Sequence, residues 1–276
     1  MKTIHTLKKV SLATFLTFVL SFSSVFAQND TMYIMKSGAI VGQYNVNTEV
    51  DSVIFYKPTI EETTSGTFTD SRDGNEYNWA QIGNQVWMAE NLAYLPSVNM
   101  VADGSEDAAG SYYYVYGYNG TNVTDAKATA NYNTYGVLYN WPAAMNGAAS
   151  STTNPSGVQG VCPTGWHLPS DAEWTELTDY LGGTSVAGGK LKETGTTHWA
   201  SPNTGATNET GFTALPGGYR YYDGTFNDFG YYGGWWSATE GGADGAWGRY
   251  MEGSYSYVLR YGYDKEVGFS VRCVRD

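Results

Sequence analysis

The stretch GWHLPSDAEW, residues 165–174, holds a histidine and two acids within seven residues. These groups are either acid–base machinery or the start of a helix. Ser170 followed three residues later by Glu173 has the pattern of a capping box, in which each residue accepts the backbone N–H of the other. We therefore predict a helix over 170–182.

The residues after this box have the spacing of a buried helix face. Trp174, Leu177 and Leu181 follow one another at intervals of three and four, which makes one face apolar. Asp171 lies in the first turn, where the helix dipole favours a negative charge. Gly182–Gly183 ends the helix. Both acids of the stretch therefore have a structural explanation.

The histidine of the stretch has no such explanation. His167 lies between Trp166 and Leu168, so it faces outward or sideways if those two face inward. No nucleophile is near it in the sequence, and His198 does not complete a metal-binding pattern with it. We expect His167 to be structural or merely exposed, and we expect no metal site.

The first 27 residues have the pattern of a secretory signal peptide. Three lysines precede the apolar run SLATFLTFVLSF, and small residues end the segment at Ala27. The apolar run is too short for a membrane span. No cysteine for a lipid anchor stands near the cut. We predict an exported chain that begins near Gln28, with no membrane insertion after cleavage, and that is extracellular, at the cell surface or periplasmic.

The composition excludes some partners and favours others. Without the signal peptide, 12 basic residues face 27 acidic ones, a net charge of −15. This charge argues against nucleic acid and anionic membranes as partners. Aromatic residues make up 16% of the chain and there are 34 glycines. Such a composition favours strands, turns and ordered loops over long helices.

Residues 28–57 are predicted to be a small β-hairpin element. MYIMKSGAIVGQYNV, residues 32–46, alternates apolar and polar residues around a turn at Lys36–Gly38, and DSVIFY, residues 51–56, follows as another strand. Residues 58–66 are polar and are predicted to be a linker. The main domain is expected over 67–276.

The main domain is predicted to open with strands. Turns are expected at Asp73–Gly74 and at Gly83–Asn84. Residues 96–134 are expected to be mostly loop, with YYYVYGY (112–118) as a strand. The second half of 135–147 is expected to turn helical.

The two cysteines, Cys162 and Cys273, form an even number in a chain predicted to be exported, so a disulfide is expected. It would close a loop of 111 residues, which stabilises by roughly 4–5 kcal/mol in the chain-entropy model. It would also fasten the last strand, VGFSVRCVRD, to the segment before the first helix. The alternative is a free reactive thiol that serves as a nucleophile.

Several blocks together resemble the Fibrobacter succinogenes major paralogous domain. They are DSRDGNEYNWAQIGNQVWMAENL, YGVLYNW, CPTGWHLPSDAEWTEL, AGGKLKETGTTHWASPNTGATNETGFTALPGGYR, WWSAT and GFSVRCV, in this order over residues 67–276. The resemblance implies an exported protein of Fibrobacteres or Bacteroidota. It implies no defined activity.

A more distant resemblance concerns the fold. GWHLPSDAEW and GFSVRCV resemble blocks of the formylglycine-generating enzymes, which have C-type-lectin-like folds. This resemblance implies an α+β domain with a small twisted antiparallel sheet, few short helices, long ordered loops and neighbouring chain ends. The thiols of that enzyme family have no counterpart here. Ser201–Asn203 lacks the acid of the acid–proline–asparagine loop of calcium-dependent lectins. We therefore expect neither an enzyme nor a cofactor.

The densest aromatic segment is GGYRYYDGTFNDFGYYGGWWSATE, residues 217–240. Trp235 and Trp236 must point to opposite faces of a strand, and aromatic rings stack well on sugars. The predicted stacking groups are Tyr222, Tyr231, Tyr232 and one of Trp235 or Trp236. Asp223, Asn227, Asp228 and Glu240 are predicted to orient sugar hydroxyls, and the acids would suit calcium, although no spacing specifies such a site. The alternative is that these rings fill the core.

Three functions remain open from the sequence. The first is an exported surface or extracellular module that binds glycan or protein, as in adhesion. The second is a passive structural module of the envelope. The third is an enzyme related to the formylglycine-generating family, which the missing cysteines oppose. We favour the binding module.

Overall fold

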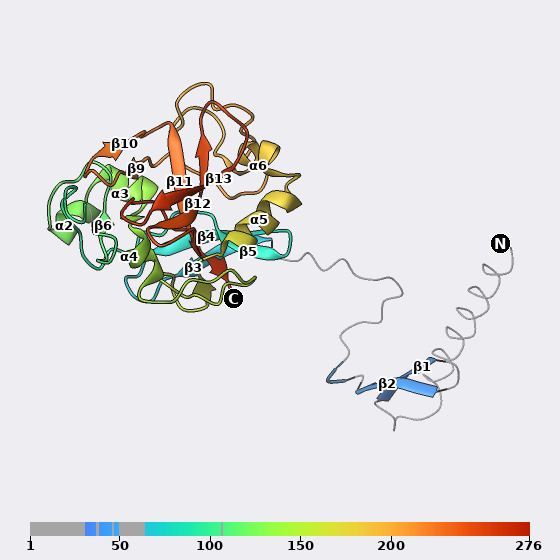
Figure 1. The fold of residues 1–276 in the computed structure, drawn as a ribbon. Coiled ribbons are helices and arrows are strands. Elements are labelled where there is room, and N and C mark those ends of the chain that lie inside the picture. The colour runs from blue at the N-terminus through green and yellow to red at the C-terminus, as the bar shows by residue number, and fades with distance from the viewer. Residues whose placement is uncertain (1–30, 37–38, 46, 50–63, 106) are drawn as a thin grey trace. The chain divides into compact units, whose positions relative to one another are not determined.

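The structure is a computed structural model that describes residues 31–36, 39–45, 47–49, 64–105 and 107–276. It divides into two compact units, Met1–Glu62 and Thr63–Asp276 (Figure 1). The predicted signal peptide, the predicted strand 51–56 and most of the predicted linker lie outside the described residues. Within the described residues, no helix is both long enough and apolar enough to cross a membrane.

The first unit contains the predicted hairpin strands. β1 (Thr31–Lys36) pairs antiparallel with β2 (Ala39–Asn45), with an irregularity between Ile34 and Met35. The two turn residues between them lie outside the described part of the chain. The exposed large side chains of this unit are Tyr33, Ile34, Ile40, Val41 and Tyr44. A two-stranded hairpin of this kind is marginally stable by itself.

The second unit contains a five-stranded antiparallel sheet that joins the start and the end of the domain. Its strand order is β3-β4-β5-β14-β8. The strands are β3 (Ser65–Thr69), β4 (Glu76–Ile82), β5 (Gln85–Met88), β14 (Val274–Arg275) and β8 (Trp166–His167). The first strand begins at Ser65, so it takes in two residues of the predicted linker.

The two predicted turns of this sheet are confirmed. Gly74 follows β3 with a φ of +79°, and its N–H donates to the Asp70 carbonyl at 2.8 Å. Gly83 joins β4 to β5 with a φ of +63°. Glycine suits both positions because it has no Cβ to clash in the left-handed region.

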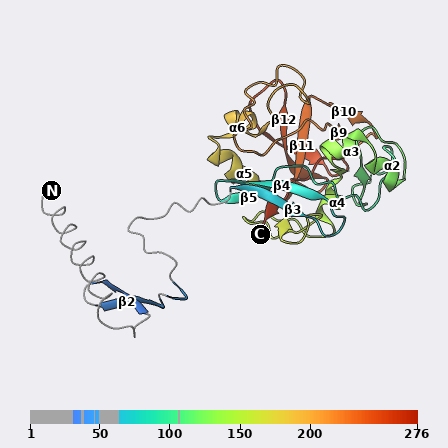
Figure 2. The same cartoon turned by 180° about the vertical axis from the view of Figure 1, so that it is seen from behind.

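A second, three-stranded antiparallel sheet is formed by β11 (Tyr232–Glu240), β12 (Gly245–Glu252) and β13 (Leu259–Asp264). Two short antiparallel pairs are also present. They are β6 (Tyr113–Tyr114) with β7 (Leu138–Tyr139) and β9 (Tyr219–Arg220) with β10 (Phe226–Asn227). Figures 1 and 2 show the second pair beside β11. The predicted strand 112–118 is thus only two residues long.

Five short helices complete the described part of the domain. They are α2 (Val123–Lys127), α3 (Ala130–Tyr135), α4 (Trp141–Met145), α5 (Asp171–Tyr180) and α6 (Thr184–Leu191). The predicted helix after Ser170 is confirmed as α5, and α4 lies where a helical turn was expected. The helices α2 and α3 fall in a segment predicted to be mostly loop. Each is one to two turns long, too short to show a periodic apolar pattern.

The helix α6 was missed because glycines disfavour helices in isolation. Two adjacent glycines, Gly188 and Gly189, lie within it. A Cβ at Gly188 would lie 2.2 Å from the Tyr257 carbonyl oxygen, and one at Gly189 would lie 2.4 Å from the Gly205 carbonyl oxygen. Close packing of the backbone therefore requires glycine at both positions, although glycine has a low helix propensity.

The domain has two hydrophobic clusters, and two of its strands lie between them. Trp236 belongs to one cluster and Trp235 to the other, and both side chains are fully buried. Trp87 and Met88 of β5 divide in the same way. The prediction that Trp235 or Trp236 would be a stacking group is therefore wrong, because core side chains cover both faces of β11.

The predicted disulfide is confirmed. Cys162 and Cys273 are joined, with their Cα atoms 6.0 Å apart. The Cys273 carbonyl also accepts the N–H of Met88 at 3.0 Å. The bond thus ties the segment before α5 to the end of the chain beside β5, and it leaves no free thiol among the described residues.

Buried cations hold the long loops in place. The Nζ atom of Lys192 donates to the carbonyls of Thr204, Glu252 and Tyr255 at 2.7–3.1 Å. Arg220 donates in the same way to carbonyls that include those of Val101 and Asp103. Buried loop carbonyls need partners that a regular ladder does not supply. The side chains of Lys192 and Arg220 supply these hydrogen-bond donors, which explains how the long loops are held in ordered conformations.

Candidate functional site

The capping box in the GWHLPSDAEW stretch is confirmed. The Glu173 N–H donates to the Ser170 hydroxyl at 3.2 Å, and the Ser170 N–H donates to the Glu173 carboxylate at 2.9 Å. The same carboxylate accepts the Ser156 N–H at 3.0 Å and lies 2.7 Å from the Nε2 atom of His167. Internal contacts thus occupy both carboxylate oxygens.

His167 is buried, so the expectation that it faces outward is wrong. Its Nδ1 atom lies 2.8 Å from a carboxylate oxygen of Asp276, the last residue of the chain, while Nε2 meets Glu173. Burial opposes a positive charge on the ring, but the hydrogen bonds and charges of the two carboxylates outweigh it and raise the pKa of His167. The histidine fastens the end of the chain to α5, which confirms the structural interpretation.

Asp171 also has a structural role beyond the helix dipole. Its carboxylate lies 2.6 Å from Arg249 and 2.9 Å from Arg260. Burial opposes ionisation of this acid, but the two arginines lower its pKa. The pairs join the start of α5 to β12 and β13. Each charged side chain of residues 165–174 therefore has a partner within the domain.

The residues predicted to form a ligand site between Tyr219 and Glu240 are only partly brought together. Tyr222 and Tyr231 are exposed, and Tyr232 is half-buried. Glu240 lies at the opposite end of β11 from Tyr232, and its carboxylate pairs with Lys265 at 2.7 Å. Glu240 is therefore not part of the same site.

The polar residues of the same segment serve the β9–β10 turn. Asp223 accepts the N–H of Thr225 at 3.0 Å and its hydroxyl at 2.6 Å. Asn227 donates to the Thr225 hydroxyl at 2.8 Å. Asp228 has a left-handed backbone, with a φ of +55°, where the chain turns toward β11. The turn orders these side chains near the exposed tyrosines.

A continuous row of tyrosines crosses this part of the domain. We call it the tyrosine row, and successive ring centroids in it lie 4.2–6.2 Å apart. In order, its members are Tyr222, Tyr221, Tyr219, Tyr232, Tyr250, Tyr263 and Tyr261. Tyr221, Tyr222 and Tyr261 are exposed, and the other four are half-buried. The contact distances are those of favourable aromatic pairs.

The strand register produces the row. Tyr261 and Tyr263 are two residues apart on β13, so they share a face, and they stand opposite Gly248 and Ala246 of β12. Gly248 leaves room for the ring of Tyr263, since a Cβ there would lie 3.2 Å from it. Phe269 lies beneath, 4.7 Å from the ring of Tyr263. Small residues thus let the rings lie against the sheet.

Sequence reasoning missed several members of the row. Tyr219 and Tyr221 lie in the segment that was singled out but were not chosen, and Tyr250, Tyr261 and Tyr263 lie outside it. The alternation of tyrosines in LRYGYD, residues 259–264, was a usable signal for a shared strand face. The pairing of β12 with β11 was not readable, because it depends on register.

The charges beside the row are acidic. Burial raises the pKa of Glu252, and the nearby charge of Asp228 raises it further. Burial, together with Asp228, raises the pKa of Tyr219 to about 12. Burial also raises the pKa values of Tyr232 and Tyr263, whose hydroxyls lie 2.5 Å apart. At neutral pH the row therefore presents uncharged hydroxyls with carboxylates beside them.

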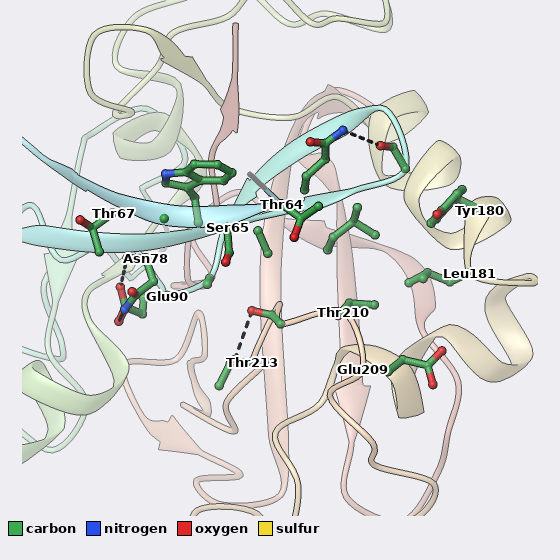
Figure 3. Close-up of a pocket in the computed structure, with 18 residues that line it drawn as sticks. Thr64, Ser65, Thr67, Asn78, Glu90, Tyr180, Leu181, Glu209, Thr210 and Thr213 are labelled. Carbon is green, nitrogen blue, oxygen red and sulfur yellow. Dashed lines mark hydrogen bonds between the residues drawn. The ribbon is translucent and has the colours of Figure 1, made fainter. Parts of the chain in front are cut away.

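A groove of about 820 Å³ lies elsewhere in the domain, between the β3–β4 hairpin and the loop before Ala214. Figure 3 shows its hydroxyl-bearing side chains on two walls, with Tyr180, the last residue of α5, and the following Leu181 at one end. The labelled polar residues of the walls are Thr64, Ser65, Thr67, Asn78, Glu90, Glu209, Thr210 and Thr213. No residue predicted to bind a ligand lies in this groove.

The acids of residues 219–240 would suit calcium, although no spacing in the sequence specifies such a site. Over the described ranges, no group of three or more His, Cys, Asp or Glu side chains is placed to hold a metal ion. In the Ser201–Asn203 tripeptide, the Asn203 amide donates to the carbonyls of Glu193 and Gly195 at 2.8 and 2.6 Å. This amide therefore ties a loop together.

These features define a disulfide-closed, loop-rich α+β domain with a tyrosine-lined face and a polar groove beside β3. The chain belongs to the Fibrobacter succinogenes major domain family, whose sequence model matches residues 80–275. That range includes both cysteines, α5 and the whole tyrosine row, but not β3. No curated protein and no solved structure matches the chain.

Proposed function

We propose that this protein is an exported binding module that holds glycans on its tyrosine row. The observation that carries the proposal is the unbroken run of seven tyrosine rings, three of them exposed. Aromatic faces bind the apolar faces of sugar rings at a low entropic cost, and nearby hydroxyls and carboxylates bind sugar hydroxyls. The acids beside the row favour neutral or amino sugars over anionic ones.

Other observations fit the same proposal. The signal-peptide pattern and the disulfide support export, since disulfides persist in oxidising compartments. The first and last strands of the domain share one sheet, which supports the C-type-lectin-like relationship inferred from sequence. Both cysteines are joined and His167 is held between two carboxylates, which argues against a catalytic role for these groups.

The test is a screen of the exported chain against neutral, amino and acidic polysaccharides, followed by calorimetry on the best ligand. Replacing both Tyr222 and Tyr261 with alanine should weaken binding by about tenfold or more, which corresponds to about 1.4 kcal/mol. The melting temperature should change little, because both side chains are exposed. Tyr180→Ala is the matched control, since Tyr180 is exposed but lies outside the row.

Two results would contradict the proposal. Full binding by the Tyr222/Tyr261 double variant would place the glycan site elsewhere. Failure of the wild-type protein to bind any polysaccharide in the screen would favour the passive structural module.

A further inference from the structure

The strand β3 is an open edge of the five-stranded sheet. It pairs with β4 on one side, and among the described residues no strand pairs with its other side. The Gln81 N–H donates to the Thr64 carbonyl, and the Asp70 N–H donates to the Asn75 carbonyl. Because alternate residues of an antiparallel strand bond to the partner strand, the backbone groups of Ser65, Thr67 and Thr69 point away from β4.

Nothing in β3 protects this edge. Natural edge strands are usually blocked by lysine, proline, a bulge or a covering segment. The sequence of β3 is SGTFT, its register with β4 is continuous, and its alternate residues Ser65, Thr67 and Thr69 are exposed. Among the described residues, three residues of this edge therefore have no strand partner, which is enough to pair with a short extended peptide.

The polar groove lies on one face of this edge. Ser65 and Thr67 line it together with Asn78 of β4, so the side chains of an added strand would enter it at alternate positions. Glu90 is the fixed charge there, because its carboxylate accepts both the backbone N–H and the side-chain amide of Asn78 at 2.7 and 2.8 Å. In the described part of the chain, Glu90 has no ion pair, whereas Glu209 pairs with Lys190.

We propose that β3 and this groove bind an extended peptide segment of a partner protein by strand addition, with basic side chains on the groove face. Main-chain hydrogen bonds to Ser65, Thr67 and Thr69 supply affinity, and alternate side chains supply specificity. The opposite face of the edge offers Phe68 and Trp79, which are half-buried, so the peptide carries apolar residues there. Glu90, without an ion pair among the described residues, and the net charge of −15 of the chain without its signal peptide fit a basic partner. This site is independent of the tyrosine row.

The probe is a labelled eight-residue peptide of alternating lysine and valine, titrated against the full exported chain by fluorescence anisotropy. Two matched peptides test the mode of binding. In these, alternate amides are N-methylated, one set on lysine and the other on valine, so each loses the donors along one edge. We expect one methylated peptide to lose binding and the other to keep it, because only one edge of an added strand pairs with β3.

Variants of the protein test the location. Thr67→Pro removes a donor that points outward and leaves the ladder to β4 intact, as prolines on edge strands do. It should weaken the lysine–valine peptide by about tenfold, whereas Thr67→Val, which keeps the N–H, should not. Glu90→Gln should weaken the same peptide and flatten its salt dependence. Glycan binding on the tyrosine row should not change in any of the three.

Several outcomes would overturn the proposal. One is equal loss, or no loss, with the two methylated peptides; another is equal binding by Thr67→Pro and Thr67→Val. A glutamate–valine peptide that binds as well as the lysine–valine peptide would exclude the basic partner. Sedimentation that shows a wild-type dimer, abolished by Thr67→Pro, would make a second copy the occupant. Slow hydrogen exchange at Ser65 and Thr67 in the free protein would show an edge already covered.

Discussion

Among single residues, the buried cations hold the loops of this domain in place. Lys192 is fully buried, its ammonium meets three carbonyls, and its ring contact is Trp199 at 5.3 Å. Burial lowers its pKa to about 8. A buried ammonium is costly unless its donors are bonded. In this domain the ammonium donates to the carbonyls of Thr204, Glu252 and Tyr255, and so joins three segments of the chain.

Replacing Lys192 with methionine should therefore destabilise the domain by about 3 kcal/mol, because three buried carbonyls lose their donor. Urea denaturation measures the change. Lys190→Met is the control: this lysine pairs with Glu209 near the surface, and such pairs contribute at most about 1 kcal/mol. If both variants lost the same free energy of unfolding, the carbonyl contacts of Lys192 would contribute no more stability than the surface ion pair of Lys190.

His167 should make the stability of the domain depend on pH. Its pKa is raised in the folded state, so its contribution is fully present below the unfolded value of about 6.5 and is lost as pH rises through the higher folded value. The stability gap between the wild type and His167→Gln should therefore shrink as the pH rises above about 6.5. Denaturation across that range measures it. His198→Gln, at a half-exposed histidine paired with Glu193, serves as control. A gap that stays constant would contradict the role of a charged His167.

At the scale of elements, α6 shows how packing overrides propensity. Gly188→Ala should raise the helix content of an isolated peptide, since glycine costs about 1 kcal/mol relative to alanine. In the domain it should instead destabilise by about 1–3 kcal/mol, because the added methyl meets the Tyr257 carbonyl at 2.2 Å. Thermal unfolding measures whether Gly188→Ala stabilises or destabilises the domain. Val186→Ala, at an exposed position on the same helix, is the control. A stabilised Gly188→Ala would show that the helix shifts freely.

At the scale of the whole molecule, the disulfide and the end of the chain act together. The bond closes a loop of 111 residues, and β14 beside it pairs with both β5 and β8. The Cys162→Ala/Cys273→Ala variant should lose about 4 kcal/mol by the chain-entropy model. Denaturation with and without reductant measures the loss. Thiol titration of the unreduced, denatured protein should find none, and two titratable thiols would contradict the bond in the exported protein.

Which elements could be predicted from the sequence depends on how many residues each signal spans. The capping box and the turn glycines act over a few residues, so α5 and the first hairpins were predictable. Two cysteines in a chain predicted to be exported allowed the bridge to be predicted across the whole domain. The short helices α2 and α3 carry too few residues for a periodic pattern, and α6 contradicts its own propensity. These were missed for local reasons.

The candidate site was predictable only in part. The aromatic density of residues 217–240 drew attention to Tyr222 and Tyr232, which belong to the tyrosine row. The same density included Trp235 and Trp236, which are core. The density of aromatic residues in a segment cannot distinguish a buried ring from an exposed one, because the residues that cover a ring come from other segments of the chain.

The family, the helix after Ser170, the hairpin turns and the cysteine pair could be read from the sequence, because those signals are either local or a matter of counting. Which aromatics are buried, where His167 points and which strands supply the tyrosine row could be read only from the folded chain. Trp235 is fixed by a hydrogen bond to Asn91, 144 residues away, and the row joins tyrosines from β9, β11, β12 and β13. Burial and register depend on contacts between distant segments, and these exist only once the chain has folded.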